Sequence, residues 1–161
     1  MYIPNHGAKS IVGLYLGVKK LITLSDGITY ENNKYIEKYQ KQINRLNRSL
    51  ARKVKGSKNF IKCKQKLATL YSKLKNARIF YAHNITKKIT DNYDIISCEN
   101  LNTINMIKKK SNLSKRVLDA TFSLILRQLQ YKSIYKGKYF YMIDRYYPSS
   151  QTCSMCNNVL S

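Results

Sequence analysis

Two cysteines near the end of the chain have the spacing of a metal or redox site. Cys153 and Cys156 form a Cys-x-x-Cys motif. The first ten residues contain no signal-peptide core, and no apolar run reaches the about eighteen residues that span a bilayer. We therefore expect a cytoplasmic protein that does not enter membranes, in which this motif indicates metal or redox chemistry rather than a structural disulfide. Cys63 and Cys98 stand alone in apolar stretches, which predicts buried side chains that pack as small hydrophobes.

Basic side chains are the second chemical signal. The chain has 30 Lys and Arg residues against 8 acids, a net charge of +22. Codon bias in an AT-rich genome is the alternative explanation, but such bias raises Asp and Glu as well as Lys. The shortage of acids therefore favours a polyanionic partner, and nucleic acid is the partner that we expect.

The basic residues concentrate where the sequence has helical periodicity. Apolar residues recur every three or four positions from Ile36 to Leu50 and again from Cys63 to Tyr81. Between the two runs, Gly56 suits the C-terminus of one helix and Ser57 the N-cap of the next. The sequence thus predicts an antiparallel helical hairpin at about residues 34–90.

Charges of one sign cover the outer faces of this hairpin. It contains seventeen Lys and Arg residues and one acid, Glu37. A merely solvated coiled coil is the alternative, but ordinary solvated helices carry charges of both signs. We expect the hairpin to bind a phosphate backbone. The residues expected to make these contacts are Lys41, Arg45, Arg48, Arg52, Lys53, Lys55, Lys58, Lys62 and Lys66.

The elements around the hairpin predict an α/β fold. Short apolar runs predict three strands before the hairpin, the last two joined by a turn at residues 25–27, and two strands after it. Leu118, Phe122, Ile125 and Leu129 mark a helix between those last two strands. The strands are predicted at residues 11–16, 20–24, 28–31, 93–98 and 138–143. This order is that of a ribonuclease H-like mixed sheet with the hairpin inserted, incomplete at the C-terminus.

Five segments carry a resemblance to a known family. They are residues 13–19 (GLYLGVK), 24–27 (LSDG), 97–102 (SCENLN), 127–132 (RQLQYK) and 144–153 (DRYYPSSQTC). Together they resemble the TnpB/OrfB proteins of bacterial insertion sequences, which are relatives of the type V CRISPR nucleases. The last segment is the most specific, and the resemblance covers roughly residues 11–161.

The resemblance implies a transposon-encoded, RNA-guided DNA endonuclease of the bacterial cytoplasm, with DNA and a guide RNA as partners. It implies a RuvC-like site in which Asp, Glu and Asp hold two Mg²⁺ ions. Hard cations prefer anionic oxygens, and two of them stabilise both the attacking and the leaving oxygen of a phosphodiester. Glu99, at the end of a predicted strand, matches the second carboxylate.

Tyr15 stands where the family has its first catalytic aspartate. A phenol is neutral near pH 7, and its oxygen lies farther from the backbone than that of a carboxylate. In the family the third aspartate follows the zinc ribbon, whereas this chain ends at Ser161. Asp144 belongs to the turn before the ribbon, where a cap or salt bridge is favoured over catalysis. We therefore expect Glu99 to be a remnant and the chain not to cleave DNA.

The same resemblance makes Cys153 and Cys156 the start of a zinc ribbon. Structural zinc takes four ligands in a tetrahedron, and these cysteines supply two of them. Free thiols are therefore expected, with zinc bridging two chains as the alternative. We divide the chain into a disordered leader (1–10), a RuvC-like core (11–147) and a truncated ribbon (148–161).

Three hypotheses follow. The chain is a catalytically inactive, nucleic-acid-binding fragment of a transposon nuclease, or a nuclease-dead, RNA-guided regulator that acts by occupying DNA. The third hypothesis is a basic coiled-coil protein unrelated to transposition, which explains the charge but not the motif at residues 144–156. We favour the first.

Overall fold

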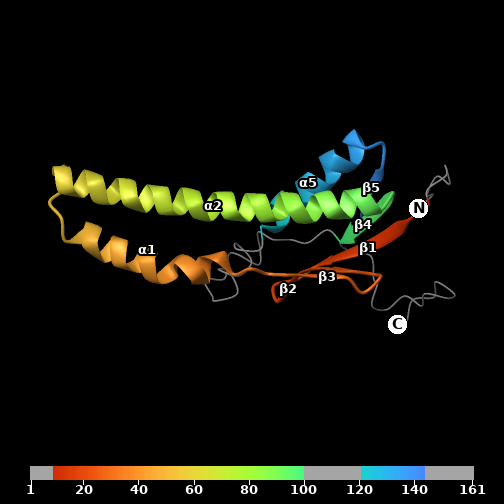
Figure 1. Cartoon of the computed structure of the whole chain (residues 1–161), viewed down its shortest axis with the longest axis horizontal. Coiled ribbons are helices and arrows are strands. Elements are labelled where there is room, and N and C mark those ends of the chain that lie inside the picture. Colours follow the sequence, from red (N-terminus) through yellow and green to blue (C-terminus); the bar gives the residue numbers. More distant parts are fainter. Residues whose placement is uncertain (1–8, 100–120, 144–161) are drawn as a thin grey trace.

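A mixed β-sheet with helices on one face forms the body of the protein. The computed structural model in Figure 1 describes residues 9–99 and 121–143. In these residues the strand order is β3-β2-β1-β4-β5, and the expected α/β fold is confirmed. The elements are β1 (Ile11–Leu16), β2 (Lys20–Leu24), β3 (Thr29–Glu31), α1 (Tyr35–Ala51), α2 (Lys58–Asn92), β4 (Ile95–Glu99), α5 (Phe122–Tyr135) and β5 (Tyr139–Ile143).

Strand β1 lies at the centre of the sheet, and its two faces differ. Val12 and Leu14 are buried, whereas Ile11 and Tyr15 are each 61% exposed. This alternation follows from the two-residue period of a strand. β1 pairs antiparallel with β2 and parallel with β4, and β4 pairs parallel with β5. Because a parallel connection needs a crossover, the hairpin and α5 fill the two crossovers on the buried face.

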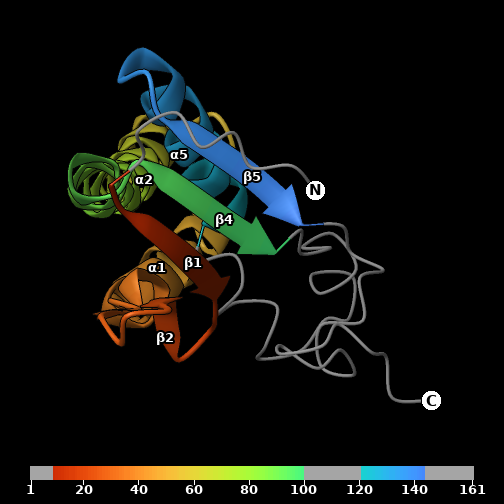
Figure 2. The same cartoon turned by 90° about the vertical axis from the view of Figure 1, so that its right-hand side faces the viewer.

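Helices α2 and α5 cover the buried face of the sheet (Figure 2). Ile89 of α2, Ile96 of β4, and Ile125 and Leu129 of α5 have no solvent exposure and belong to one core cluster. Burial of each such side chain contributes about 1.5–3 kcal/mol relative to leaving it exposed. This core fixes the sheet edge on which the candidate site residues lie.

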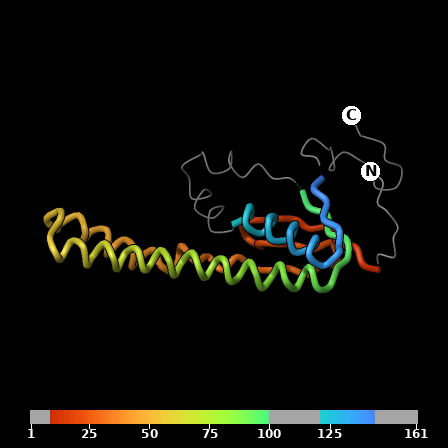
Figure 3. Tube along the Cα trace, turned by 90° about the horizontal axis from the view of Figure 1, so that it is seen from above, coloured from red at the N-terminus to blue at the C-terminus, as the bar shows by residue number. Residues whose placement is uncertain are grey.

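The predicted helical hairpin is present as α1 and α2, which run antiparallel and project well beyond the sheet (Figure 3). Ile43, Leu70 and Leu74 are buried in its seam, as the periodicity predicts. Ser57 caps α2, its Oγ accepting a hydrogen bond from the Phe60 amide at 3.1 Å. These seam residues form a second, smaller core, and α2 connects it to the core beneath the sheet.

Gly56 does not end α1, which is a correction. α1 ends at Ala51, and Gly56 lies in the connection with φ 83°, a left-handed conformation that favours glycine. The prediction was wrong because a glycine marks a positive φ but not which turn contains it. α2 continues to Asn92, so β4 begins at Ile95 rather than at residue 93.

A polar seam joins α2 to α5 inside the fold. The Thr86 hydroxyl donates to Gln128 Oε1 at 2.9 Å, and Lys132 Nζ donates to Thr86 Oγ1 at 2.7 Å. Both Thr86 and Gln128 are buried, and burial lowers the pKa of Lys132. These paired groups set the register of α5 on α2, because leaving any of them unpaired costs free energy.

Residues 9 and 10, at the end of the predicted leader, are hydrogen-bonded to the start of β4. The Lys9 amide donates to Asp94 Oδ2 at 3.0 Å, and the Ser10 carbonyl accepts from the amides of Asp94 and Ile95. These bonds start the β1–β4 ladder. Residues 1–8 and 144–161, with the remaining domain boundaries, lie outside the described residues. Over the part that is described, no helix has the length and apolarity to cross a membrane.

Candidate functional site

Tyr15 and Glu99 meet at one edge of the sheet. β1 and β4 are parallel, and Leu14 lies opposite Cys98. The next pair in this register is Tyr15 and Glu99, near the carboxyl ends of both strands. Leu14 and Cys98 point into the core, so Tyr15 and Glu99, both exposed, point to the opposite face. The structure therefore places side by side the two residues that the sequence singled out for a nuclease site.

The backbone around Tyr15 is held tightly. Gly17 comes directly after the last residue of β1. A Cβ at Gly17 would lie 2.7 Å from the Lys20 carbonyl oxygen, so only glycine fits this turn. The buried Asn32 donates from its side chain to the Val18 carbonyl at 3.1 Å. The position of Tyr15 is thus fixed by the turn and by the chain that enters α1.

These residues do not fit a two-metal site. Within residues 9–99 and 121–143, no group of three or more His, Cys, Asp and Glu side chains could hold a metal ion. Tyr15 and Glu99 together offer one carboxylate, whereas a pair of divalent cations needs several anionic oxygens. Cys153, Cys156 and Asp144 lie outside the described residues.

A polar groove runs along one flank of the hairpin. Its floor is formed by Leu46, Cys63 and Leu70, which belong to the seam between α1 and α2. Among the described residues that line it, none is acidic. The walls are Gln42, Arg45 and Ser49 from α1, Lys53 from the connection after α1, and Asn59, Lys62, Gln65, Lys66, Thr69 and Lys73 from α2.

Four of the nine predicted phosphate-binding residues therefore come together in this groove: Arg45, Lys53, Lys62 and Lys66. Lys73 also lines it and was not predicted. It lies seven residues after Lys66 and so on the same side of α2, a spacing that could have identified it.

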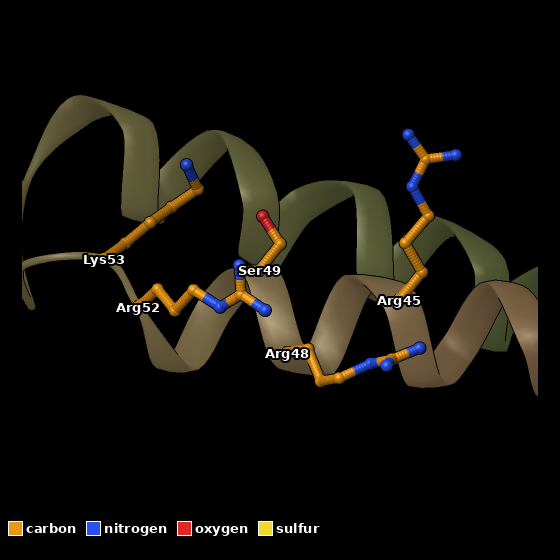
Figure 4. Close-up of a pocket in the computed structure, with 5 residues that line it drawn as sticks. All are labelled: Arg45, Arg48, Ser49, Arg52 and Lys53. Carbon is orange, nitrogen blue, oxygen red and sulfur yellow. The ribbon is translucent and has the colours of Figure 1, made fainter.

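The other predicted residues lie elsewhere on the hairpin. Arg48 and Arg52 line a hollow of about 370 Å³ at the C-terminal end of α1, which borders the groove through Arg45 and Lys53. Figure 4 shows Arg45 and Lys53 reaching across toward α2, while Arg48 and Arg52 lie along α1.

Three further predicted residues, Lys41, Lys55 and Lys58, are exposed outside the groove. Lys41 lies on α1, Lys55 in the connection and Lys58 at the start of α2. The hairpin thus presents cations over a broad surface, and the groove is where cations of the two helices face each other.

Two other chemically notable groups have structural roles. Cys63 and Cys98 are free and buried, as predicted, and burial raises the pKa of Cys98 to about 12, so its thiol is inert. At the sheet edge opposite the Tyr15 site, the Tyr93 hydroxyl donates to the Asp26 carboxylate. This bond raises the pKa of Tyr93 to about 12 and lowers that of Asp26.

Comparison with known sequences identifies relatives along nearly the whole chain. A protein 36% identical over 169 residues, described as "Putative RNA-guided DNA endonuclease InsQ", comes from Escherichia coli strain K12. The match covers 96% of this chain and 42% of that protein. A second relative, "Putative RNA-guided DNA endonuclease" of Streptomyces pristinaespiralis, is 28% identical, with coverages of 97% and 39%. The chain thus spans about two fifths of the length of these relatives.

Solved structures share the fold. The cryo-EM structure of a Cas12f1–sgRNA–target DNA complex matches with a TM-score of 0.59 and 17% identity, over 99% of this chain and 41% of that protein. A CRISPR-Cas12f ternary complex matches with the same TM-score and 18% identity, over 98% and 33%. At these identities the likeness establishes the fold alone, and it agrees with the RuvC-like sheet expected from the sequence.

Family models account for both halves of the chain. Residues 122–160 match the Cas12f1-like TNB domain. Residues 3–110, two thirds of the chain, match the OrfB_IS605 model, described as "Probable transposase". The resemblance to TnpB/OrfB proteins is therefore confirmed, and this chain belongs to the OrfB_IS605 family of transposon-associated, TnpB-type proteins.

Proposed function

We propose that this chain is a nucleic-acid-binding member of the TnpB/OrfB group whose nuclease site does not cut. The observation that carries the proposal is the parallel register of β1 and β4, in which Tyr15 and Glu99 each follow the last paired residues, Leu14 and Cys98. In this arrangement Glu99 supplies one carboxylate and Tyr15 supplies none. Two Mg²⁺ ions at that edge would lack most of the anionic oxygens that they require.

DNA and a guide RNA are the partners that we propose. Supporting this, relatives of the chain are described as RNA-guided DNA endonucleases, and the Cas12f1 structure with the same fold was solved with sgRNA and target DNA. The hairpin adds an argument from this chain itself, because seventeen cations and one acid on it favour a polyanion.

A cleavage assay tests the loss of activity. The full chain, purified with any bound RNA, is incubated with Mg²⁺ and either supercoiled plasmid or single-stranded DNA. We expect no product above that of a Glu99→Gln control. Mg²⁺-dependent cleavage that disappears in Glu99→Gln would overturn the proposal.

A nuclease-dead, RNA-guided regulator is the second candidate. It is favoured by the intact scaffold, since Tyr15 leaves the β1 pairing and the core face of Leu14 undisturbed. Treatment of the purified protein with ribonuclease separates the candidates. A guided regulator loses sequence-specific DNA binding on this treatment, whereas an unguided remnant binds DNA without sequence preference before and after it.

A further inference from the structure

The cations of the hairpin are not distributed evenly around it. On α2, Lys62, Lys66 and Lys73 lie on the flank that lines the groove. Lys64 and Lys75 lie on the opposite flank, because successive helical residues turn by about 100°. On that opposite flank α1 contributes Gln40, Asn44, Asn47 and Ala51, none of which is charged. The groove side is therefore the more positive side of the hairpin.

Cations face each other across this groove. Cys63 Sγ lies 3.7 Å from the Leu46 carbonyl oxygen, which fixes how the antiparallel helices are aligned. With this alignment Arg45 lies across from Lys66, and Ser49 lies across from Lys62. Two walls that both carry donors can hold a single anionic chain between them.

The spacing along the walls suits a repeating anion. On α1, Arg45 and Ser49 lie four residues apart, which is about 6 Å of helix, and Lys53 follows in the connection after α1. The groove extends along α2 from Asn59 to Lys73, about 21 Å. A donor thus recurs about once per helical turn, and a polynucleotide backbone presents its phosphates with comparable regularity.

We infer that this groove binds the sugar-phosphate backbone of one polynucleotide strand, which runs along the hairpin with its bases facing away. The inference deepens the proposed function and rests on it. A single strand fits better than a duplex, because both walls can then reach the same row of phosphates. The groove contains no aromatic side chain on which a base could stack, so binding does not depend on base identity.

Two matched double variants of the full chain test this inference. Lys62→Gln with Lys66→Gln removes two charges from the groove. Lys64→Gln with Lys75→Gln removes two charges from the opposite flank of the same helix. All four lysines are exposed, so both variants keep the fold.

The measurement is the affinity for fluorescent oligo-dT and for a duplex of equal length, over a range of salt concentrations. For a single strand, each lost phosphate contact lowers the slope of log K against log salt by about 0.7. The groove variant is thus expected to lose about 1.4 in slope, or about 25-fold in affinity at 0.1 M salt. The flank variant is expected to retain the slope of the unmodified chain. The groove variant is expected to lose less affinity for the duplex than for the single strand.

Each contrary outcome points to a different failure. Equal losses in both variants would mean that the hairpin attracts nucleic acid without using the groove, and would overturn the inference alone. An unchanged slope in the groove variant would place the strand elsewhere, and a larger loss for the duplex would make the duplex the ligand. Absence of salt-dependent binding by the unmodified chain would overturn the proposed function as well.

Discussion

A carboxylate placed at position 15 should be repelled by the carboxylate of Glu99, and the resulting loss of stability tests whether the two positions are neighbours. In Tyr15→Asp, a carboxylate would stand beside Glu99 on the adjacent parallel strand. Neighbouring strands lie roughly 5 Å apart, a distance at which two unit charges repel by about 0.8 kcal/mol in water and about 3 kcal/mol at an effective dielectric of 20. Because Tyr15 is 61% exposed, the lower value applies. We expect Tyr15→Asp to be about 1 kcal/mol less stable than Tyr15→Asn.

Thermal unfolding at low salt measures this difference as about 2–4 °C in Tm. Mg²⁺ at ten times its Kd would stabilise Tyr15→Asp by about 1.4 kcal/mol and so cancel the gap, while Tyr15→Asn would not respond. The double variant Tyr15→Asp with Glu99→Gln is the control for the loss of the tyrosine itself, because it lacks the tyrosine but also lacks the repulsion between the two carboxylates. If Tyr15→Asp and Tyr15→Asn unfold at the same temperature with and without Mg²⁺, then positions 15 and 99 do not face each other as the register requires.

Two further predictions concern hydrogen bonds inside the fold. Thr86→Val removes the hydroxyl that is hydrogen-bonded to Gln128 and Lys132. We therefore expect urea unfolding to show that the free energy of unfolding falls by about 1–3 kcal/mol. An unchanged free energy of unfolding would mean that the polar seam is not formed. The pKa of Tyr93 is raised to about 12 by Asp26, so its bond stabilises the fold below pH 10 and this contribution is lost as the pH rises toward 12. The stability difference between the unmodified chain and Tyr93→Phe should therefore shrink over that interval, and a difference that persists at pH 12 would contradict the bond.

Local patterns in the sequence were sufficient to predict most elements. The boundaries of β1 and β2 match the predicted ranges, since both strands are short apolar runs that supply buried residues to the core. The seam residues Ile43, Leu70 and Leu74 were identified by helical periodicity, which depends on neighbours three and four positions away. Ser57 was identified as a cap because its chemistry is local.

Interactions between distant segments could not be predicted in this way. Nothing in the sequence pairs Thr86 with Gln128, because Thr and Gln are ordinary surface residues and only the packing of α5 buries them. The groove has the same origin. Arg45 and Lys66 line the same groove because of the alignment of two helices, whereas the sequence predicted that both contact a phosphate backbone but not that they share a groove.

The nuclease edge and the basic groove depend on different parts of one helix. The second half of α2 packs Ala82, Ile85 and Ile89 against the sheet, and its first half carries Lys62 and Lys66 over the groove. Tyr15 is exposed at the end of β1 and contributes to neither core. We therefore expect its replacement to leave nucleic-acid binding by the hairpin unchanged. Under the proposed function, loss of the first carboxylate would therefore remove cleavage without removing binding, whereas a cavity in the core under α2 would weaken both.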